Sequence, residues 1–565
     1  MPRSKPPEPI SPVAAALAKD RLGVPSVLFF VLAGVAPLTV AAGVIPTAFE
    51  VTGQTGVPAG FLIVAVVLAV FSAGYVAMAR HISNAGAFYA FIARGLGRPA
   101  GVAAALVALA SYNLLQVGLY GAFGAGFASY AADDFGIQLD WWVWALALWV
   151  VVTGLGQVRV DLSGVLLGVL LTAELLTVVA LTINGLIHPA NGRLSLATLS
   201  PTHLTTGGVG AVLAVAVTGY VGFEQSPVYA EEARNSRRTV PMATFLSLGL
   251  IAVVYASAAL AMAVAYGDGN VVAVAGQQGS SMLFSLGSGI LPHLGRTLFL
   301  TSVFAAALAF HNACWRYSFA LGRERVLPEA FGRTGRAGVP KLASAVQSAF
   351  GFAVIIVYAL AHWDPMVNLF FWLGTTGGAG ILILLAVTSI SVVCYFARHP
   401  HGEPYWIRVI APSAAAVALL AMVWLCLDNY STLLGVPAGS RAAKLLPAIF
   451  GVVAVIGYIW ALLLKRRRPE VYLVIGLGVH AATRRAMPGT IVTTGTRGTV
   501  HPGGARAWAD NAYDPDTEDQ DDAATALVRR MTEELLRDRK PGPATAPARP
   551  NDPAAPAAAP KEEDR

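Results

Sequence analysis

Long apolar runs separated by short polar loops occupy the chain from residue 25 to residue 464. A helix of about 20 mostly apolar residues is needed to cross a bilayer core about 30 Å thick. The pattern predicts an all-α polytopic membrane protein, and it excludes a soluble enzyme, a secreted disulfide scaffold and a disordered protein. About twelve transmembrane helices are expected, at residues 25–49, 59–79, 99–130, 141–157, 162–187, 208–230, 240–266, 292–321, 342–362, 367–397, 407–428 and 444–464.

The composition agrees with this pattern. Hydrophobic residues make up 56% of the 565 positions and charged residues 13%, whereas soluble proteins average about 25% charged residues. The net charge is +7, but the basic residues sit between apolar spans, so we expect membrane lipid and not nucleic acid as their partner. Cys314, Cys394 and Cys426 show no metal-ligand spacing and are expected to be small buried residues. No metal site, cofactor or enzymatic motif is predicted.

Lys and Arg are distributed unequally between the two alternating sets of loops that connect the spans. Cytoplasmic loops of membrane proteins carry an excess of these residues. The poorer set contains Arg193, Arg296, Arg441 and Lys444, together with acidic residues such as Asp133. We therefore predict a multi-pass protein of the cytoplasmic (plasma) membrane, with an even number of spans and with the richer loops and both termini in the cytoplasm. The richer set contains Arg80, Arg94, Arg98, Arg159, Arg234, Arg237, Arg238, Arg323, Arg325, Arg333, Arg336, Lys341, Arg398 and Arg408.

The composition also divides the chain into three parts. Residues 1–23 are predicted to be a cytoplasmic N-terminal segment, residues 24–466 a transmembrane domain, and residues 467–565 a cytoplasmic and mostly disordered tail. Within the tail, Gly476 and Gly478 belong to a Gly-x-Gly-x-x-Ala run that imitates the dinucleotide-binding fingerprint. Because polar low-complexity sequence follows it instead of a βαβ unit, nucleotide binding is not expected.

Two spans contain glycine and proline where they should interrupt the helix. The first span holds the sequence Gly-Val-Ala-Pro-Leu at residues 34–38, and the sixth holds Gly219, Gly222 and Pro227. An interrupted helix in a bilayer frees backbone groups that need a cavity or a ligand as partner. Two such helices, five spans apart, are typical of inverted-repeat proteins with a binding site at the bilayer midplane. We expect half-helix N-termini to face a carboxylate there and freed carbonyls to face an ammonium group.

Polar side chains inside the spans are the other candidates for chemistry. Only two acidic residues, Glu174 and Glu224, lie well inside predicted spans, and a charge in lipid is costly enough to make each a functional candidate. Burial disfavours the charged form of a carboxyl, so Glu174 is expected to exchange a proton near neutral pH. The alternative for Glu174 is a protonated carboxyl that bonds a neighbouring helix. Asn113, Gln116 and Tyr120 share one helical face, which predicts either cavity lining or helix contact.

Four stretches of the sequence form further motifs. They are Arg80–Tyr89 with Arg94–Gly97, Gly222–Glu224 with Glu231–Pro241, His311–Tyr317 with Leu321–Pro328, and Arg466–Tyr472. Together they resemble the amino acid–polyamine–organocation (APC) permeases of the bacterial amino acid permease type, over roughly residues 23–475. The resemblance implies a five-plus-five inverted repeat with interrupted helices one and six, two further helices, and alternating access for amino acids or related amines.

The resemblance also implies roles for individual positions. Residues 34–38 match the unwound segment of helix one, residues 219–222 match that of helix six, and Glu224 matches the acid that often follows it. Thr218 stands where many members place an aromatic gate, and Tyr220 is a candidate replacement. The predicted substrate-binding residues are Gly34, Val35, Ala36, Pro37, Leu38, Thr218, Gly219, Tyr220, Gly222, Glu224 and Asn113.

The resulting hypothesis is a secondary active permease that moves amino acids or related amines across the cytoplasmic membrane, with protons as the coupling ion. Glu174 stands where some family members carry a lysine in place of a sodium ion, and an acid at this position favours a proton. A polyamine or organocation exchanger or exporter of the same fold is the alternative, with Glu174 and Glu224 as the acids that such a cation needs. A membrane receptor or sensor that signals through its tail is a third hypothesis.

Overall fold

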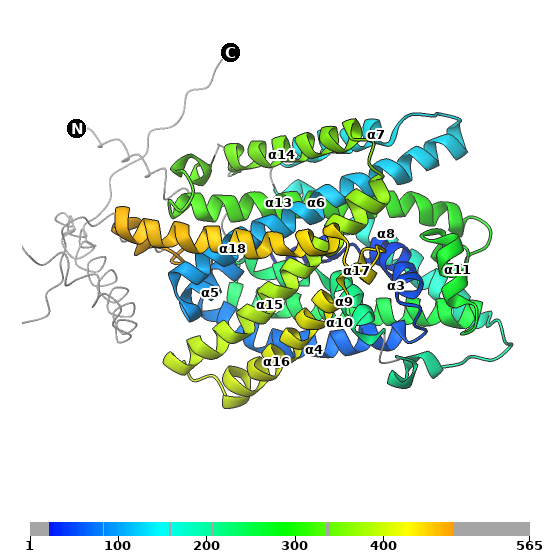
Figure 1. Ribbon diagram of the computed structural model, residues 1–565, viewed down its shortest axis with the longest axis horizontal. Helices are drawn as coiled ribbons and strands as arrows, with labels where there is room; N and C mark the ends of the chain where they lie inside the picture. Colours follow the sequence, from blue (N-terminus) through cyan, green and yellow to red (C-terminus); the bar gives the residue numbers. More distant parts are fainter. Residues whose placement is uncertain (1–21, 83, 158–159, 205–207, 335–338, 479–565) are drawn as a thin grey trace, which may run out of the picture. The chain divides into compact units, whose positions relative to one another are not determined.

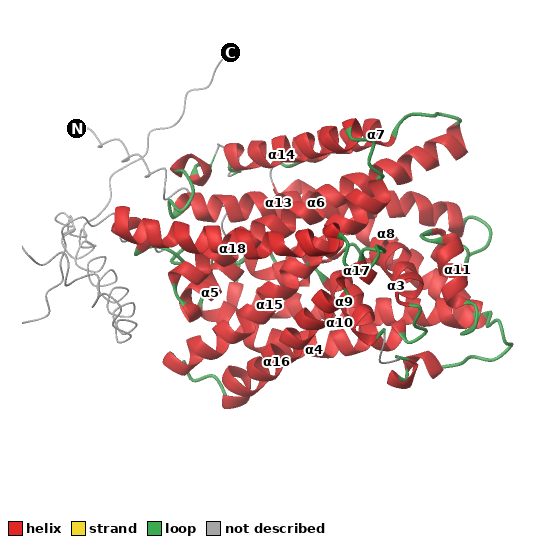
Figure 2. Cartoon of the chain, in the orientation of Figure 1, coloured by secondary structure: helices red, strands yellow, loops and turns green. Residues whose placement is uncertain are grey.

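All regular elements in the described part of the protein are helices. The computed structural model describes residues 22–82, 84–157, 160–204, 208–334 and 339–478, without the side chains of residues 160–167. No strand occurs in these ranges (Figure 2). The prediction of an all-α membrane protein is therefore confirmed, whereas residues 1–21 of the predicted N-terminal segment and the tail beyond residue 478 lie outside the described residues.

Eleven helical segments of the described chain are long and apolar enough to cross a bilayer. Their ends agree with the predicted spans to within a few residues, and the remaining predicted span, 141–157, is the helix α7 (Trp141–Leu155). At 15 residues, α7 is shorter than the about 20 residues that a bilayer core requires. The uninterrupted long helices are α4 (Val57–His81), α6 (Arg98–Phe135), α8 (Val160–Ile187), α10 (Ser236–Tyr266), α13 (Leu291–Arg323), α14 (Lys341–Leu360), α15 (Trp372–Arg398), α16 (Ala411–Asp428) and α18 (Arg441–Arg467).

The first and sixth spans are interrupted, as their glycine and proline residues predicted. The first span comprises α1 (Val24–Val35), α2 (Pro37–Thr39), a π-helical turn, and α3 (Ile45–Thr52). The sixth comprises α9 (Val209–Tyr220) and, after a break, a 3₁₀ segment over Phe223–Tyr229. Each span therefore consists of helical parts on the two sides of a break in the helix.

Short helices connect the long ones and were not predicted, because they are far too short to produce a spanning apolar run. Helix α5 packs against α6 and α15 at one end of the described unit, and α11 packs against α3 at the other (Figure 1). A π-helical segment over Pro365–Phe371 leads directly into α15. The short helices are α5 (Phe88–Leu96), α11 (Val271–Gln278), α12 (Ser281–Phe284), α17 (Tyr430–Leu433) and α19 (Pro469–Tyr472).

Helix α6 lies at the centre of the packing, in contact with α7, α13, α15 and α18. Small residues on α6 permit this close approach; a Cβ on Gly124, for example, would lie 2.5 Å from the carbonyl oxygen of Trp141 on α7. Helix α18 is peripheral and exposes large apolar side chains, among them Val452 and Ile456. Such a face is suited to contact with lipid.

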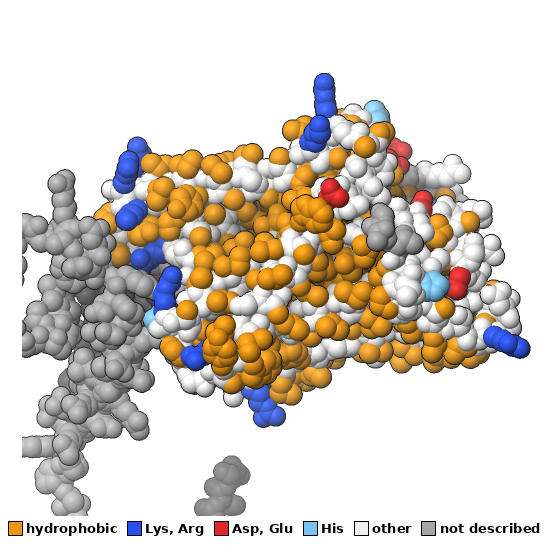
Figure 3. Space-filling view, turned by 60° about the horizontal axis from the view of Figure 1, so that its bottom comes forward, with side chains coloured by type: hydrophobic (Ala, Val, Ile, Leu, Met, Phe, Trp, Pro, Cys, Tyr) orange, Lys and Arg blue, Asp and Glu red, His pale blue; other side chains and the backbone are white. Residues whose placement is uncertain are grey.

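The two ends of the described helical unit differ in charge. Arg80 lies in the last turn of α4, Arg323 in that of α13 and Arg398 in that of α15, while α6 begins at Arg98. We call this end, where α4, α13 and α15 finish and α6 and α10 begin, the charged end. In Figure 3 most of the visible Lys and Arg side chains lie toward the left, the visible acidic side chains lie toward the right, and apolar surface covers the region between them.

Candidate functional site

The interruption of the first span is a single residue in a left-handed conformation. Ala36, between α1 and α2, has φ 51° and ψ 70°, which is rare for a residue with a Cβ. Pro37 follows it and has no N–H, so the carbonyl of Ala33 receives no hydrogen bond from the residue four positions on. The last carbonyls of α1 and the first N–H groups of α2 therefore lack partners within their own helices.

The interruption of the sixth span is centred on Gly222. Helix α9 ends at Tyr220, Val221 is extended, and Gly222 has φ 115°, a conformation that favours glycine. The N–H of Gly222 donates to Oε2 of Glu224 at 2.8 Å, and the N–H of Gln225 donates to the carbonyl of Gly222 at 3.0 Å. The break is thus held by its own short-range hydrogen bonds.

The two interruptions touch each other. A Cβ on Gly222 would lie 2.8 Å from the backbone nitrogen of Val35 and 2.9 Å from the carbonyl carbon of Gly34. A Cβ on Gly34 would in turn lie 3.3 Å from Oε1 of Gln225. Two segments almost two hundred residues apart in sequence are therefore in direct backbone contact, and only glycine permits that contact at position 222.

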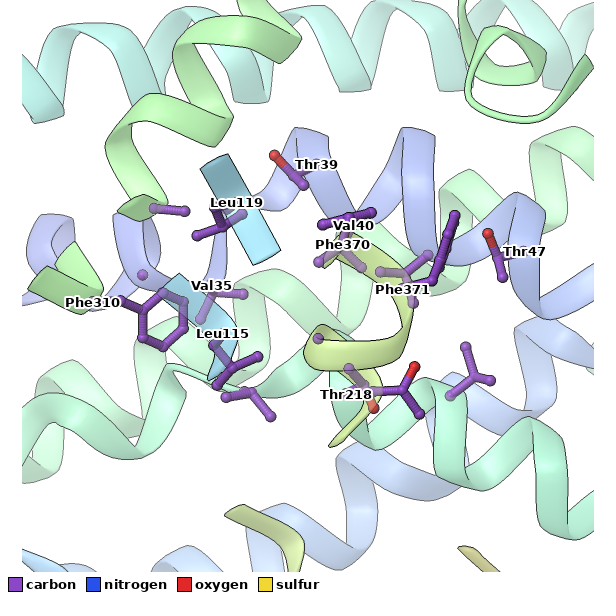
Figure 4. A pocket seen from close by; sticks show the side chains of 18 of the residues that line it. Val35, Thr39, Val40, Thr47, Leu115, Leu119, Thr218, Phe310, Phe370 and Phe371 are labelled. Carbon is purple, nitrogen blue, oxygen red and sulfur yellow. The ribbon is translucent and has the colours of Figure 1, made fainter. Parts of the chain in front are cut away.

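A cavity lies beside this contact, with about 100 Å³ open to the centres of water molecules. Its residues come from the first span, α6, α9, α13, the π-helical segment before α15, the start of α15, and α17 (Figure 4). The wall is apolar apart from four threonines, and none of the described residues that line it is charged. The lining residues are Gly34, Val35, Ala36, Thr39, Val40, Val44, Thr47, Leu115, Leu119, Val215, Thr218, Val221, Ala306, Phe310, Phe370, Phe371, Gly374, Thr375 and Leu433.

Some of the predicted binding residues line this cavity and others lie behind it. Four of them contribute directly to the wall: Gly34, Val35, Ala36 and Thr218. The others are buried or half-buried neighbours that do not belong to the lining: Pro37, Leu38, Gly219, Tyr220, Gly222, Glu224 and Asn113.

Tyr220 points away from the cavity. Its hydroxyl donates to the carbonyl of Phe61 at 3.0 Å, and its ring packs against those of Phe61 and Tyr255. These partners belong to α4 and α10, so the ring anchors the end of α9 to the neighbouring helices. The aromatic rings that do line the cavity are those of Phe310, Phe370 and Phe371.

Glu224 is fully buried and fully hydrogen-bonded at the second break. Its Oε1 accepts from the hydroxyl of Tyr112 at 2.9 Å, and its Oε2 accepts from the N–H of Gly222. Its backbone carbonyl accepts from the hydroxyl of Tyr75 at 2.8 Å. Because Tyr75 is on α4 and Tyr112 on α6, Glu224 ties the interrupted helix to α4 through its backbone carbonyl and to α6 through its carboxyl. Neither tyrosine was predicted; a phenol within an apolar span was the signal that could have found them.

Glu174 lies on α8, only 1% exposed, and its Oε1 has no hydrogen-bond partner in the described part of the chain. Helix α8 packs against α1 and α2 on either side of the first break, and also against α10 and α13. Tyr255 of α10 and Ser302 of α13 lie near the carboxyl. Neither hydroxyl has a partner at hydrogen-bonding geometry among the described residues. Glu174 therefore stands behind the broken first helix and outside the cavity.

Asn113 belongs to a polar network that joins three helices. Its Oδ1 accepts from Nε2 of Gln347 on α14 at 2.8 Å, and the same amide group donates to Oε1 of Gln116. Nε2 of Gln116 also lies 3.0 Å from the hydroxyl of Tyr120 and 3.3 Å from Nδ1 of His311 on α13. In this structure the predicted polar face of α6 contacts α13 and α14.

Two buried ion pairs lie at the charged end. Arg316 Nε lies 2.8 Å from Oε1 of Glu232, and Arg323 binds both oxygens of Glu231 at 2.7 and 2.8 Å. All four side chains are at most 4% exposed. These pairs connect the loop after the sixth span to the last turns of α13, and each acid has its own arginine.

Glu324, one residue beyond α13, is held by the segment that follows α18. Its carboxylate accepts from the N–H groups of Gly476 and Gly478, both at 2.7 Å, and also from the hydroxyl of Tyr89 and the amide of Asn84. Burial raises the pKa of Glu324, although these hydrogen bonds oppose the shift. The Gly-x-Gly run thus binds a carboxylate of the protein itself. No group of His, Cys, Asp and Glu in the described ranges is arranged to hold a metal ion.

The chain matches a known protein family over most of its membrane region. Residues 22–458 match the sequence model of a family described as amino acid permease. A curated protein, the dicarboxylic amino acid permease of Saccharomyces cerevisiae, is 31% identical over 150 residues, which cover 24% of this chain. The matched region spans 25% of that protein's length, so the similarity reaches only about a quarter of the relative.

Proposed function

Because the chain belongs to the amino acid permease family, a transporter family without enzyme activity, we propose that it moves an amino acid or related amine across the cytoplasmic membrane by alternating access. The observation that carries this proposal is the contact between Gly222 and the backbone of residues 34–35, with a cavity beside it. Residues 24–466 would form the transporter domain as a five-plus-five inverted repeat with two further helices. The charged end would face the cytoplasm, since it carries most loop Lys and Arg.

The broken backbones supply the groups that every amino acid needs. Unpartnered N–H groups at the start of a half-helix favour a carboxylate, and unpartnered carbonyls at the end of one favour an ammonium group. Gly34, Val35 and Ala36 would present these backbone groups, and Thr218 would contact the bound molecule from α9. The remaining predicted residues would shape the site from behind: Pro37, Leu38, Gly219, Tyr220, Gly222, Glu224 and Asn113.

We further propose that protons drive the transport and that Glu174 carries them. The carboxyl is buried with a free oxygen, and its helix packs against both halves of the broken first span. A change in its protonation would act on the packing of α8, the helix that touches α1 and α2 on either side of the first break. Glu224 is a weaker candidate for this role, because both of its oxygens already accept hydrogen bonds.

The experiment is transport by the purified full chain in liposomes, with each radiolabelled amino acid tested separately. An imposed inward proton gradient should drive accumulation in the unaltered protein. Glu174→Gln should lower this gradient-driven accumulation by at least about tenfold, while exchange between labelled and unlabelled substrate at equal pH persists. Asp133→Asn is the matched control, since that acid is 65% exposed near the end of α6.

The outcomes separate the two parts of the proposal. Gradient-driven accumulation that is unchanged in Glu174→Gln would contradict proton coupling through this residue and leave transport intact. Absence of exchange for every amino acid and amine, with a folded protein, would contradict the permease function. Polyamine exchange gains no support from the site, because neither Glu174 nor Glu224 lines the cavity.

A further inference from the structure

Selection among amino acids must come from the side chains in the cavity wall and not from the backbone groups at the two helix interruptions. The α-carboxylate and α-ammonium groups are common to all amino acids, so the backbone groups at the interruptions cannot distinguish one from another. The side chain of a substrate bound there would lie against the wall formed by Leu115, Leu119, Phe310, Phe370 and Phe371. The chemistry of this wall therefore defines the class of side chain that fits.

The polar groups in the wall are too few and too weak to accept a charged side chain. Thr47 and Thr218 already donate their hydroxyls to the carbonyls of Gly43 and Ala214 in their own helices. Thr39 Oγ1 is buried without a partner, but a neutral hydroxyl does not offset a full charge. Removing an ion from water without a counter-ion costs several kcal/mol.

None of the described charged side chains lines the cavity, including Glu174 with its unpartnered oxygen. A carboxylate side chain would need a cation, but Arg316 and Arg323 are paired with Glu232 and Glu231 outside the cavity. An ammonium side chain would need an acid, but Glu224 is occupied by Tyr112 and the N–H of Gly222 and is not in the wall. Either kind of charged side chain would therefore be buried against apolar groups.

We infer that this site takes amino acids with an uncharged, apolar side chain, branched aliphatic or aromatic, and rejects acidic and basic ones; the inference rests on the proposed function. The name of the yeast relative describes that protein as a permease for dicarboxylic amino acids, so the inferred substrates of this chain differ from those. The similarity to the relative covers only a quarter of the relative's length. It also excludes polyamines, which carry two or more charges and no apolar side chain.

Competition for exchange in liposomes tests the inference. Exchange of radiolabelled leucine by the unaltered protein is to be measured in the presence of one unlabelled competitor at a time. The competitors are leucine, phenylalanine, glutamate, aspartate, lysine and putrescine. Leucine and phenylalanine should compete at concentrations about 100-fold lower than the charged compounds, which corresponds to about 2.7 kcal/mol. If glutamate, lysine or putrescine competes as well as leucine, the inference is wrong while the permease function stands. If no compound is exchanged at all, the proposed function fails instead.

A pair of variants at Thr375 sharpens the result. Thr375 lines the cavity at the start of α15 and is half-buried, so a longer side chain can reach into the space. Thr375→Lys introduces a cation, and Thr375→Met introduces a side chain of similar length without charge. Relative to Thr375→Met, Thr375→Lys should improve competition by glutamate by at least about tenfold. Equal competition by glutamate in two folded variants would contradict the view that the missing cation sets the selectivity.

Discussion

The cavity at the interruptions and the charged end are two buried regions that share helix α13. They differ in how their buried polar groups are paired. At the charged end, Arg316 and Arg323 are each paired with a glutamate, and Glu324 accepts four hydrogen bonds. At the cavity and the adjacent break, Thr39 Oγ1 and both amide atoms of Gln225 are buried without partners among the described residues. In the first region each of these charged groups is paired or hydrogen-bonded within the protein, although Nε of Arg323 has no partner among the described residues. In the second region the unpartnered groups are uncharged, and they remain available to a ligand.

This difference has an energetic consequence. Unpaired buried polar groups each cost about 1–3 kcal/mol, and they persist in native proteins mainly where function requires them. A paired buried charge is not strongly stabilising overall, but the loss of one partner is severely destabilising. Substitutions at the charged end should therefore act on stability, and substitutions at the interruptions should act on transport.

The largest effect is expected from Arg316→Met at the charged end. This change leaves the carboxylate of Glu232 buried without a counter-ion, because its two hydrogen bonds from the guanidinium, at 2.8 and 3.3 Å, are lost. The expected loss of stability is about 3–5 kcal/mol. Thermal unfolding of the purified protein in detergent, together with the yield of folded protein, measures it.

The double variant Arg316→Met with Glu232→Leu is the control for that prediction. It removes both charges and fills the space with apolar side chains, so most of the lost stability should return. A double variant as unstable as Arg316→Met alone would show that the cost comes from packing of the arginine over Tyr229 and Trp315 and not from the unpaired charge.

A smaller loss of stability but a large loss of transport is expected from Gly222→Ala. The new Cβ would lie 2.8 Å from the nitrogen of Val35, and φ 115° is strained for alanine. The strain costs about 1–3 kcal/mol, and the two interruptions must separate to relieve it. Exchange of labelled leucine in liposomes should fall by at least about tenfold. Gly249→Ala on α10 is the matched control, since its Cβ would meet nothing within 4 Å and should leave exchange unchanged.

The interruptions were predictable because their causes are local. Pro37 lacks an N–H, and Gly222 permits a left-handed backbone, so both breaks appear in the sequence as Gly and Pro within apolar runs. The long helices were predictable for the same reason, since twenty apolar residues in succession have few other solutions in a bilayer. Helices α5 and α11 have no such signal, because their length is set by the elements they connect.

The partners of the buried acids were not predictable, because they come from distant segments. Glu224 and Tyr112 are 112 residues apart, and Glu232 and Arg316 are 84 apart. The sequence identifies Glu224 as an acid in a span, but only the packing shows that its two oxygens are already engaged. The same applies to Glu324, whose partners include the glycines of a run that resembles a nucleotide-binding motif.

The smallest effect is expected from an ion pair that belongs to neither region. Arg296 and Asp133 lie 3.9 Å apart at the end opposite to the charged end, with side chains 46% and 65% exposed. Water screens such a pair, so Arg296→Ala should change stability by less than about 1 kcal/mol. The measurement is thermal unfolding in the same detergent as for Arg316→Met. The loss of stability on removal of the arginine would then differ several-fold between the two arginine–carboxylate pairs. The cause would be the burial of the carboxylate that remains. If Arg296→Ala were as destabilising as Arg316→Met, the loss of an arginine would matter irrespective of burial, and the contrast between the charged end and the rest of the molecule would fail.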